Sequence, residues 1–122
     1  MFSINRFNAG LNTHFIGKKV KYIEETSSTN DIALDLLDSN KEDGTLIITD
    51  CQQNGRGRRQ NQWIANPKKS LTFSFILFPQ NNFKNLGILP LLTGVSIVNG
   101  LKKSTNINVG LKWPNDIMLN GK

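Results

Sequence analysis

The spacing of apolar and polar residues predicts a strand followed by a helix near the start of the chain. Apolar and β-branched residues over 20–23 favour a strand. Apolar residues then recur with helical spacing over about 29–39, which gives this helix one apolar face. Ser27 or Ser28 suits its N-cap, and Ser28 with Asp31 has the spacing of a capping box, in which each side chain bonds the backbone of the other residue.

Two further strands are predicted on either side of a long polar segment. The β-branched run over 45–49 is typical of a buried strand, and 70–78 is the strongest strand pattern in the chain. Residues 51–70 between them are polar, glycine-bearing and basic, which predicts a loop of a length that is usually functional. Residues 1–18 carry no clear period. In the strand over 70–78, the apolar residues on one face are Leu71, Phe73, Phe75 and Leu77.

The second half of the chain predicts one helix and two short strands. The helix spans 89–103, with Pro90 in its first turn and lysines at its end, where cations oppose the negative pole of the helix dipole. Strands are expected at 109–112 and 117–119, with a Trp-Pro-Asn break between them.

A hairpin signal closes the chain. Asn120 and Gly121 form the strongest two-residue turn signal, and a returning strand is needed after them. A strand without a partner leaves its backbone groups unpaired. We therefore expect residues 1–122 to be the N-terminal part of a catalytic domain whose C-terminal remainder is absent; the alternative is an edge strand with a frayed tail.

Composition narrows the class of protein. Lys and Arg number 15 against nine acids, a net charge of +6 that suits an anionic ligand or partner and equally a solubilising surface. A single cysteine, Cys51, excludes an internal disulfide and fits a reducing compartment. No apolar run reaches the roughly 18 residues that a membrane span requires, and no secretory signal is visible. We expect a cytoplasmic protein without a membrane partner.

Three segments carry candidate chemistry. Residues 25–30 place hydroxyls and an amide at a helix start, which alone indicates helix capping. Residues 52–59 combine glycines with arginines suited to phosphate and carboxylate, but match neither the Walker loop nor the dinucleotide fingerprint. Trp63 can stack on a base or belong to the core. Residues 112–116 flank a rigid turn with a lysine and an acid, an arrangement that suits phosphate and Mg²⁺ or a packing corner.

Taken together and in this order, Ser-Ser-Thr-Asn, Gly-Arg-Gly-Arg-Arg and Lys-Trp-Pro-Asn-Asp resemble the biotin–protein ligase family over residues 20–122. The resemblance implies an α+β fold, a mixed, mainly antiparallel sheet with helices packed on one side. It implies an ATP-dependent ligase, such as a biotin–[acetyl-CoA-carboxylase] ligase, that forms biotinyl-AMP. The enzyme then transfers biotin to a lysine of a biotin carboxyl carrier protein. Biotin and ATP with Mg²⁺ are the implied substrates, and a second copy of the chain is a candidate partner.

The resemblance also assigns residues. Arg56, Arg58 and Lys112 would stabilise the developing charge, and no resident metal site is expected. Gln60 stands where the family often has glycine, which affects loop flexibility, and the family's essential lysine would follow Lys122. The biotin pocket would comprise Ser28, Thr29, Asn30, Gln52, Gly55 and Arg56. The ATP site would comprise Arg58, Arg59, Trp63, Lys112, Asn115 and Asp116.

Two alternative functions stay open at this point. A lipoate-type ligase would share the fold, although the Gly-Arg-Gly-Arg-Arg segment favours biotin. A non-catalytic basic module that binds RNA would explain the charge of +6 and the arginines, but not the two flanking motifs. We therefore expect no nucleic-acid partner. The sequence does not decide which carrier is modified or whether this piece folds and is active alone.

Overall fold

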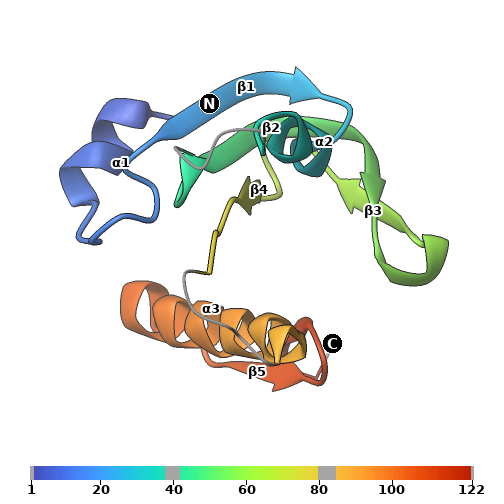
Figure 1. Cartoon of the computed structure of the whole chain (residues 1–122). Helices are drawn as coiled ribbons and strands as arrows, with labels where there is room; N and C mark the ends of the chain where they lie inside the picture. Colours follow the sequence, from blue (N-terminus) through green and yellow to red (C-terminus); the bar gives the residue numbers. More distant parts are fainter. Residues whose placement is uncertain (1, 38–41, 80–84, 122) are drawn as a thin grey trace. The chain divides into compact units, whose positions relative to one another are not determined.

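The computed structural model describes residues 2–37, 42–79 and 85–121, in two compact units, Met1–Phe78 and Pro79–Lys122. Figure 1 shows the helices and strands of each unit. The first unit contains α1 (Ile4–Gly10), β1 (Val20–Thr26), α2 (Thr29–Asp35), β2 (Leu46–Arg56), the 3₁₀ turn Arg58–Gln60, β3 (Gln62–Ala65) and β4 (Thr72–Phe75). The second contains the 3₁₀ turn Leu86–Ile88, α3 (Leu89–Thr105), β5 (Val109–Lys112) and β6 (Asp116–Leu119).

The sheet of the first unit is built around β2. This strand pairs in parallel with β1 and antiparallel with β3 and β4. The first residues of β2 are apolar and form the core of this unit. Ile47 is fully buried between Leu46 and Ile48, as the β-branched run over 45–49 predicts. Burial of the Ile47 side chain contributes about 2 kcal/mol to folding. These strand pairings confirm the mixed, mainly antiparallel sheet that the family resemblance implies.

The polar half of β2 corrects the loop prediction. Residues 51–56 continue the strand and 62–65 return as β3, so the expected loop over 51–70 is wrong for these residues. Backbone pairing on both sides stabilises them, since Cys51 and Gln52 lie opposite β1 and Gln52 also lies opposite β3. Polar side chains are accommodated because this end of the strand is mostly exposed.

The helix α2 is shorter than predicted and is capped differently. It ends at Asp35 with a turn over 36–37, and the remainder of the predicted helix, 38–39, lies outside the described residues. Ser28 is the N-cap, as predicted, yet within the described part of the chain its side chain makes no capping hydrogen bond. The capping-box prediction is wrong because the carboxylate of Asp31 pairs instead with Arg56.

The strand β4 and the segment before β1 differ from the sequence patterns. Strand β4 is shorter than 70–78, and Thr72 on its hydroxyl face is 6% exposed while Leu71 is 73% exposed. The hydroxyl face is the covered one because α2 bonds to it through Ser74. Residues 1–18 contain α1, which at seven residues is too short to show a period.

The second unit is a helix on a β-hairpin. Helix α3 has Pro90 in its first turn and Lys102 and Lys103 in its last turn, as predicted. It approaches β5 closely, since a Cβ on Gly94 would lie 2.6 Å from Leu111 Cδ1. Strands β5 and β6 pair antiparallel, so the predicted strand 117–119 has its partner in the strand before it. Asn120 and Gly121 both have positive φ, the geometry that their turn signal predicts.

Candidate functional site

A hydrogen-bonded polar cluster joins the start of α2 to β2. Ser28 and Thr29 are each only 3% exposed, although both are hydroxyl residues. The side-chain carbonyl Oε1 of Gln52 accepts from the backbone N–H of Thr29 at 2.9 Å and from its hydroxyl at 3.3 Å. The structure therefore brings together three of the residues assigned to biotin, and fixes the amide orientation of Gln52.

Ser74 of β4 belongs to the same cluster and was missed by the sequence analysis. Its hydroxyl lies 2.8 Å from the Thr29 hydroxyl and donates to Oδ1 of Asn30 at 2.6 Å. Ser74 gives its one proton to Asn30 and therefore accepts in the hydroxyl pair, so Thr29 shares its own single proton between Ser74 and Gln52. The carbonyls of Asn30 and Gln52 are thus both acceptors, which leaves their NH₂ groups as donors for a ligand. The sequence signal that could have identified Ser74 is its place on the face of the strand opposite the phenylalanines.

A bulge in β2 gives Gly55 its role. Gln52 lies opposite Ala65 and Gly55 lies opposite Trp63, so three steps on β2 correspond to two on β3. The bulge turns Gly55 toward the same side as Gln52. A Cβ on Gly55 would lie 2.4 Å from Nε2 of Gln52 and 2.6 Å from the backbone oxygen of Trp63. The polar cluster therefore requires glycine at position 55, because only a hydrogen fits where other residues carry Cβ.

Arg56 adds a positive charge beside the cluster. Its guanidinium donates from one terminal nitrogen to Asp31 Oδ2 at 3.2 Å and from the other to Asp31 Oδ1. The hydrogen bonds and the charge of Asp31 raise the pKa of Arg56, so the group stays cationic at any practical pH. The side chain is 61% exposed, which leaves it accessible to an anion.

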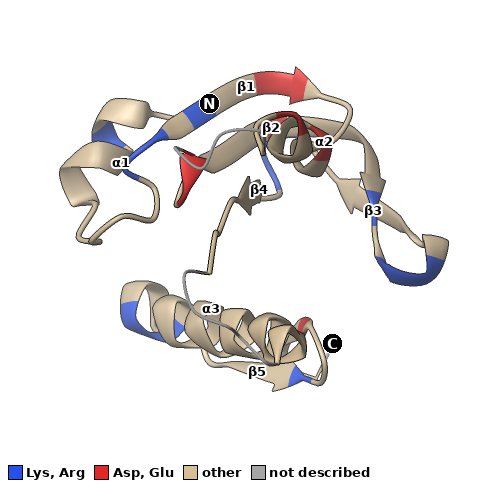
Figure 2. Ribbon diagram, viewed as in Figure 1, with Lys and Arg blue, Asp and Glu red and all other residues tan. Residues whose placement is uncertain are grey.

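The other arginines and Trp63 lie beyond Arg56. Arg58 and Arg59 are exposed in the 3₁₀ turn between β2 and β3, where Figure 2 shows positive charge gathered. Arg59 and Gln60 both have a left-handed backbone, with φ of 55° and 65°. Trp63 follows on β3 and is 55% exposed. Side chains suited to phosphate and to stacking are therefore present here, on the accessible surface.

An apolar hollow adjoins the polar cluster. It has a volume of about 380 Å³ and lies between one face of α2 and the residues around the end of β4. Asn30 belongs both to this hollow and to the cluster, so the two are continuous. Pockets for small organic ligands combine an apolar lining with a few placed polar groups in this way. The hollow is lined by Asn30, Ala33, Leu34, Leu37, Phe75, Ile76 and Leu77.

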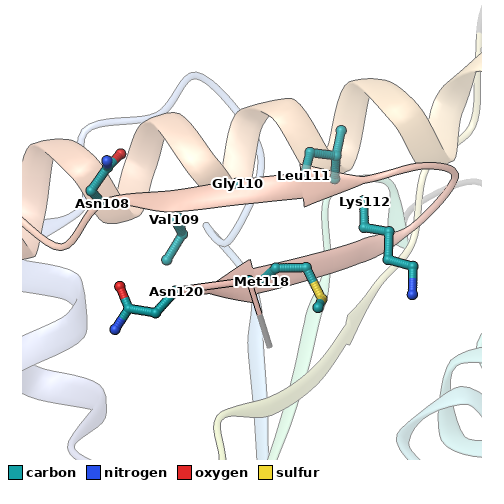
Figure 3. Close-up of a pocket in the computed structure, with 8 residues that line it drawn as sticks. Asn108, Val109, Gly110, Leu111, Lys112, Met118 and Asn120 are labelled. Atoms are coloured by element: carbon teal, nitrogen blue, oxygen red, sulfur yellow. The ribbon is translucent and has the colours of Figure 1, made fainter.

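The remaining predicted residues lie in the second unit, around the turn between β5 and β6. Lys112 and Asp116 are opposite one another in the ladder, and Asn115 lies in the turn between them. A second hollow, of about 340 Å³, lies along this hairpin and includes Lys112 and Met118 in its lining. Figure 3 shows the Leu111 side chain directed toward α3 and the Lys112 side chain directed away from it.

Over residues 2–37, 42–79 and 85–121, no three His, Cys, Asp or Glu side chains form a group that could hold a metal ion. None of the helices in the described ranges has the length and apolar character needed to cross a membrane.

Known proteins resemble this chain in sequence and in structure. The bifunctional ligase/repressor BirA of Bacillus subtilis is 36% identical over 113 residues, which are 93% of this chain and 35% of that protein. The structure of the Aquifex aeolicus biotin protein ligase in complex with biotin and ATP matches with a TM-score of 0.70 and 37% identity, over 84% of this chain and 42% of that one. The Leishmania major biotin protein ligase, at 24% identity and a TM-score of 0.75, supports the fold alone. The chain thus spans between 35% and 49% of the length of these relatives.

The match to a protein family covers most of the chain. Residues 22–122 match the Biotin/lipoate A/B protein ligase family. This range contains β1 from Tyr22 onward, the polar cluster, the 3₁₀ turn Arg58–Gln60 (the arginine turn) and the β5–β6 hairpin. The family resemblance stated from the three motifs is confirmed. This chain belongs to the Biotin/lipoate A/B protein ligase family.

Proposed function

We propose that this chain is part of an ATP-dependent biotin–protein ligase, corresponding to the first part of its catalytic domain. The observation that carries the proposal is the continuity of three features in the first unit. These are buried hydroxyl groups with their amide partners, an apolar hollow and an arginine. The relatives named as biotin ligases support biotin over lipoate as the substrate.

Biotin has three chemically different parts that match these features. Its ureido carbonyl accepts hydrogen bonds, which the NH₂ groups of Asn30 and Gln52 offer. The ureido N–H groups donate, and the hydroxyls of Ser28 and Thr29 contain acceptor oxygens. Its apolar ring and chain suit the hollow beside Asn30, and its carboxylate suits the guanidinium of Arg56.

The proposed reaction has two steps. A carboxylate oxygen of biotin attacks the α-phosphorus of ATP, and the bond to pyrophosphate breaks to give biotinyl-AMP. The amine of a carrier lysine then attacks the acyl carbon, and AMP leaves with the electrons of the acyl–oxygen bond. The attacked α-phosphate gains charge in the first step, and Arg56, Arg58 and Lys112 are proposed to stabilise it.

The nucleotide side of the site is proposed from the exposed cations and from the hairpin of the second unit. ATP would arrive with Mg²⁺ as a substrate. Asn115 and Asp116 supply oxygen ligands of the kind Mg²⁺ prefers, and Trp63 supplies a surface on which adenine can stack. The proposed ATP residues are Arg58, Arg59, Trp63, Lys112, Asn115 and Asp116.

Calorimetric titration of biotin, with lipoate as the control, into the full-length protein tests the proposal. Saturable binding of biotin alone, followed by biotin-dependent exchange of pyrophosphate into ATP, is the expected result. Binding of lipoate alone would assign the other activity of the family. Binding of neither ligand, with RNA binding that falls steeply as salt increases, would replace the ligase with a basic binding module.

A further inference from the structure

The side chain of Asp31 has no place in the proposed reaction, yet it makes a specific contact. It lies in the first turn of α2, where its sequence spacing predicts a capping role. Its two carboxylate oxygens instead accept from the two terminal nitrogens of Arg56, a fork-on-fork arrangement. Helix stability does not explain why Asp31 pairs with Arg56 of the proposed site and not with the backbone at the start of its own helix.

We propose that Asp31 is a positioning residue, which holds the Arg56 guanidinium beside the polar cluster in readiness for the carboxylate of the substrate. This inference rests on the proposed ligase function, because it concerns the same substrate. It adds a residue that none of the three sequence motifs singles out for the reaction.

Arg56 has enough N–H donors to bind Asp31 and a substrate carboxylate at the same time. A guanidinium carries five N–H donors, and Asp31 takes one from each terminal nitrogen. The Nε–H and one further hydrogen on each terminal nitrogen are left over by this pair. A second anion can therefore bind to the edge that contains Nε without displacing Asp31. The pair orients the group and does not use up its donors.

The position of the pair supports the same conclusion. Thr29 of α2 bonds Gln52 of β2, and two residues later Asp31 of the same helix bonds Arg56 of the same strand. The two contacts fasten α2 to β2 at both parts of the proposed biotin site. Without the second contact, Arg56 would be a long side chain at an exposed strand end, 61% accessible, with many rotamers to lose when a ligand binds.

The test uses the full-length protein with Asp31→Asn, which keeps the shape and removes the charge. We expect the Kd and KM for biotin to rise about fivefold, the scale of an exposed but well-formed ion pair. We expect kcat to change by less than about twofold, because Asp31 does not touch the reacting atoms. Asp31→Glu should recover part of the affinity. Asp35→Asn is the matched control, since it removes the same charge from an exposed position on the same helix.

A double-mutant cycle with Arg56→Ala separates positioning from other effects. The Asp31→Asn substitution should cause no further loss of affinity once Arg56 is absent. In the ligand-free protein, the terminal Nη–H signals of Arg56, which donate to Asp31, should be protected from exchange in the parent and lose that protection in Asp31→Asn.

Three results would overturn the inference: unchanged or tighter biotin binding by Asp31→Asn, an equal loss in Asp35→Asn, or a full additional loss in the Arg56→Ala background. Tighter binding would mean that Asp31 competes with the substrate. A parent protein that binds no biotin would instead remove the proposed function, and the inference with it. A parent that binds biotin with no effect of Asp31→Asn would remove the inference alone.

Discussion

The polar cluster and the arginine turn share strand β2 but differ in how far they are organised without a ligand. In the cluster, Thr29 is almost completely buried and bonded to both Gln52 and Ser74. In the turn, Arg58 and Arg59 are exposed, and Trp63 shows more than half of its surface to solvent. A rigid small molecule such as biotin suits a preformed pocket, whereas a flexible triphosphate can order the side chains that bind it. Substitutions in the cluster should therefore weaken biotin binding, whereas substitutions in the turn should slow the reaction with ATP.

The largest effect is expected for Gly55→Ala, because the new methyl group has no space. It would meet the Gln52 amide and the Trp63 backbone at distances far below van der Waals contact. We expect the free energy of unfolding to fall by about 3 kcal/mol and biotin binding to weaken by about a hundredfold, measured by thermal melting and titration. Gly57→Ala is the control in the same segment, since its nearest contact would be the backbone oxygen of Asn61 at 3.2 Å. Equal losses for the two variants would show that the cluster has no special need for glycine.

Arg58→Ala should separate the two regions most clearly. Loss of one cation that stabilises the developing charge is expected to slow biotinyl-AMP formation by about a hundredfold, as followed by pyrophosphate exchange. Biotin affinity should stay within about threefold of the parent, because the cluster and Arg56 are unchanged. A rate within that same factor of the parent would remove Arg58 from the proposed catalytic residues. A large loss of biotin affinity would show that the turn and the cluster act as one unit.

Ser74→Ala tests the part of the cluster that the sequence did not indicate. The substitution leaves Asn30 without its donor and Thr29 without one of its two acceptors. Biotin binding should weaken by about tenfold, the scale of one hydrogen bond, because the amide of Asn30 loses the bond that orients it. Ser70→Ala is a suitable control, since the Ser70 hydroxyl only accepts from the backbone of Asn66 in an exposed turn. No difference in affinity between Ser74→Ala and the parent would place Ser74 outside the site.

The sequence predicts elements well where a local pattern determines them. The strand at 109–112 has its predicted bounds, and α3 extends the predicted helix by only two residues at its end. The polar end of β2 was missed because pairing with β1 and β3 stabilises it, and no local pattern reports such pairing. Ser74 was missed for the same reason, since its partners Thr29 and Asn30 lie 45 and 44 positions away.

The motifs located most of the cluster, but they did not supply its contacts. Gln52 and Gly55 were assigned by resemblance, and their mutual need follows only from the bulge between them. Gln60, where the family often has glycine, has a φ of 65°, a conformation that glycine adopts without strain. The departure from the family pattern thus falls on a residue whose backbone favours the family's choice. The roles of the assigned residues stay predictions until their variants are measured.

The smallest expected effect concerns Tyr22, which provides a reference outside both regions. Its hydroxyl donates to Asp50 at 2.7 Å, and this bond with the nearby negative charge raises its pKa to about 12. Below pH 10 the tyrosine is protonated in the folded and unfolded chain, so the bond contributes fully to stability. Between pH 10 and about 12 the unfolded chain loses the proton first, so this contribution falls as the pH rises through that window.

Absorbance of the phenolate during an alkaline titration checks the assignment. Subtracting the titration of Tyr22→Phe isolates the signal of this residue. The midpoint should lie near 12 in the parent and move toward 10 in Asp50→Asn, while biotin affinity at neutral pH stays unchanged. A parent midpoint near 10 would mean that the bond to Asp50 does not persist in solution. A change in biotin affinity would mean that Tyr22 and Asp50 are coupled to the polar cluster although they lie outside it. The difference between the two regions would then depend on residues elsewhere in the sheet.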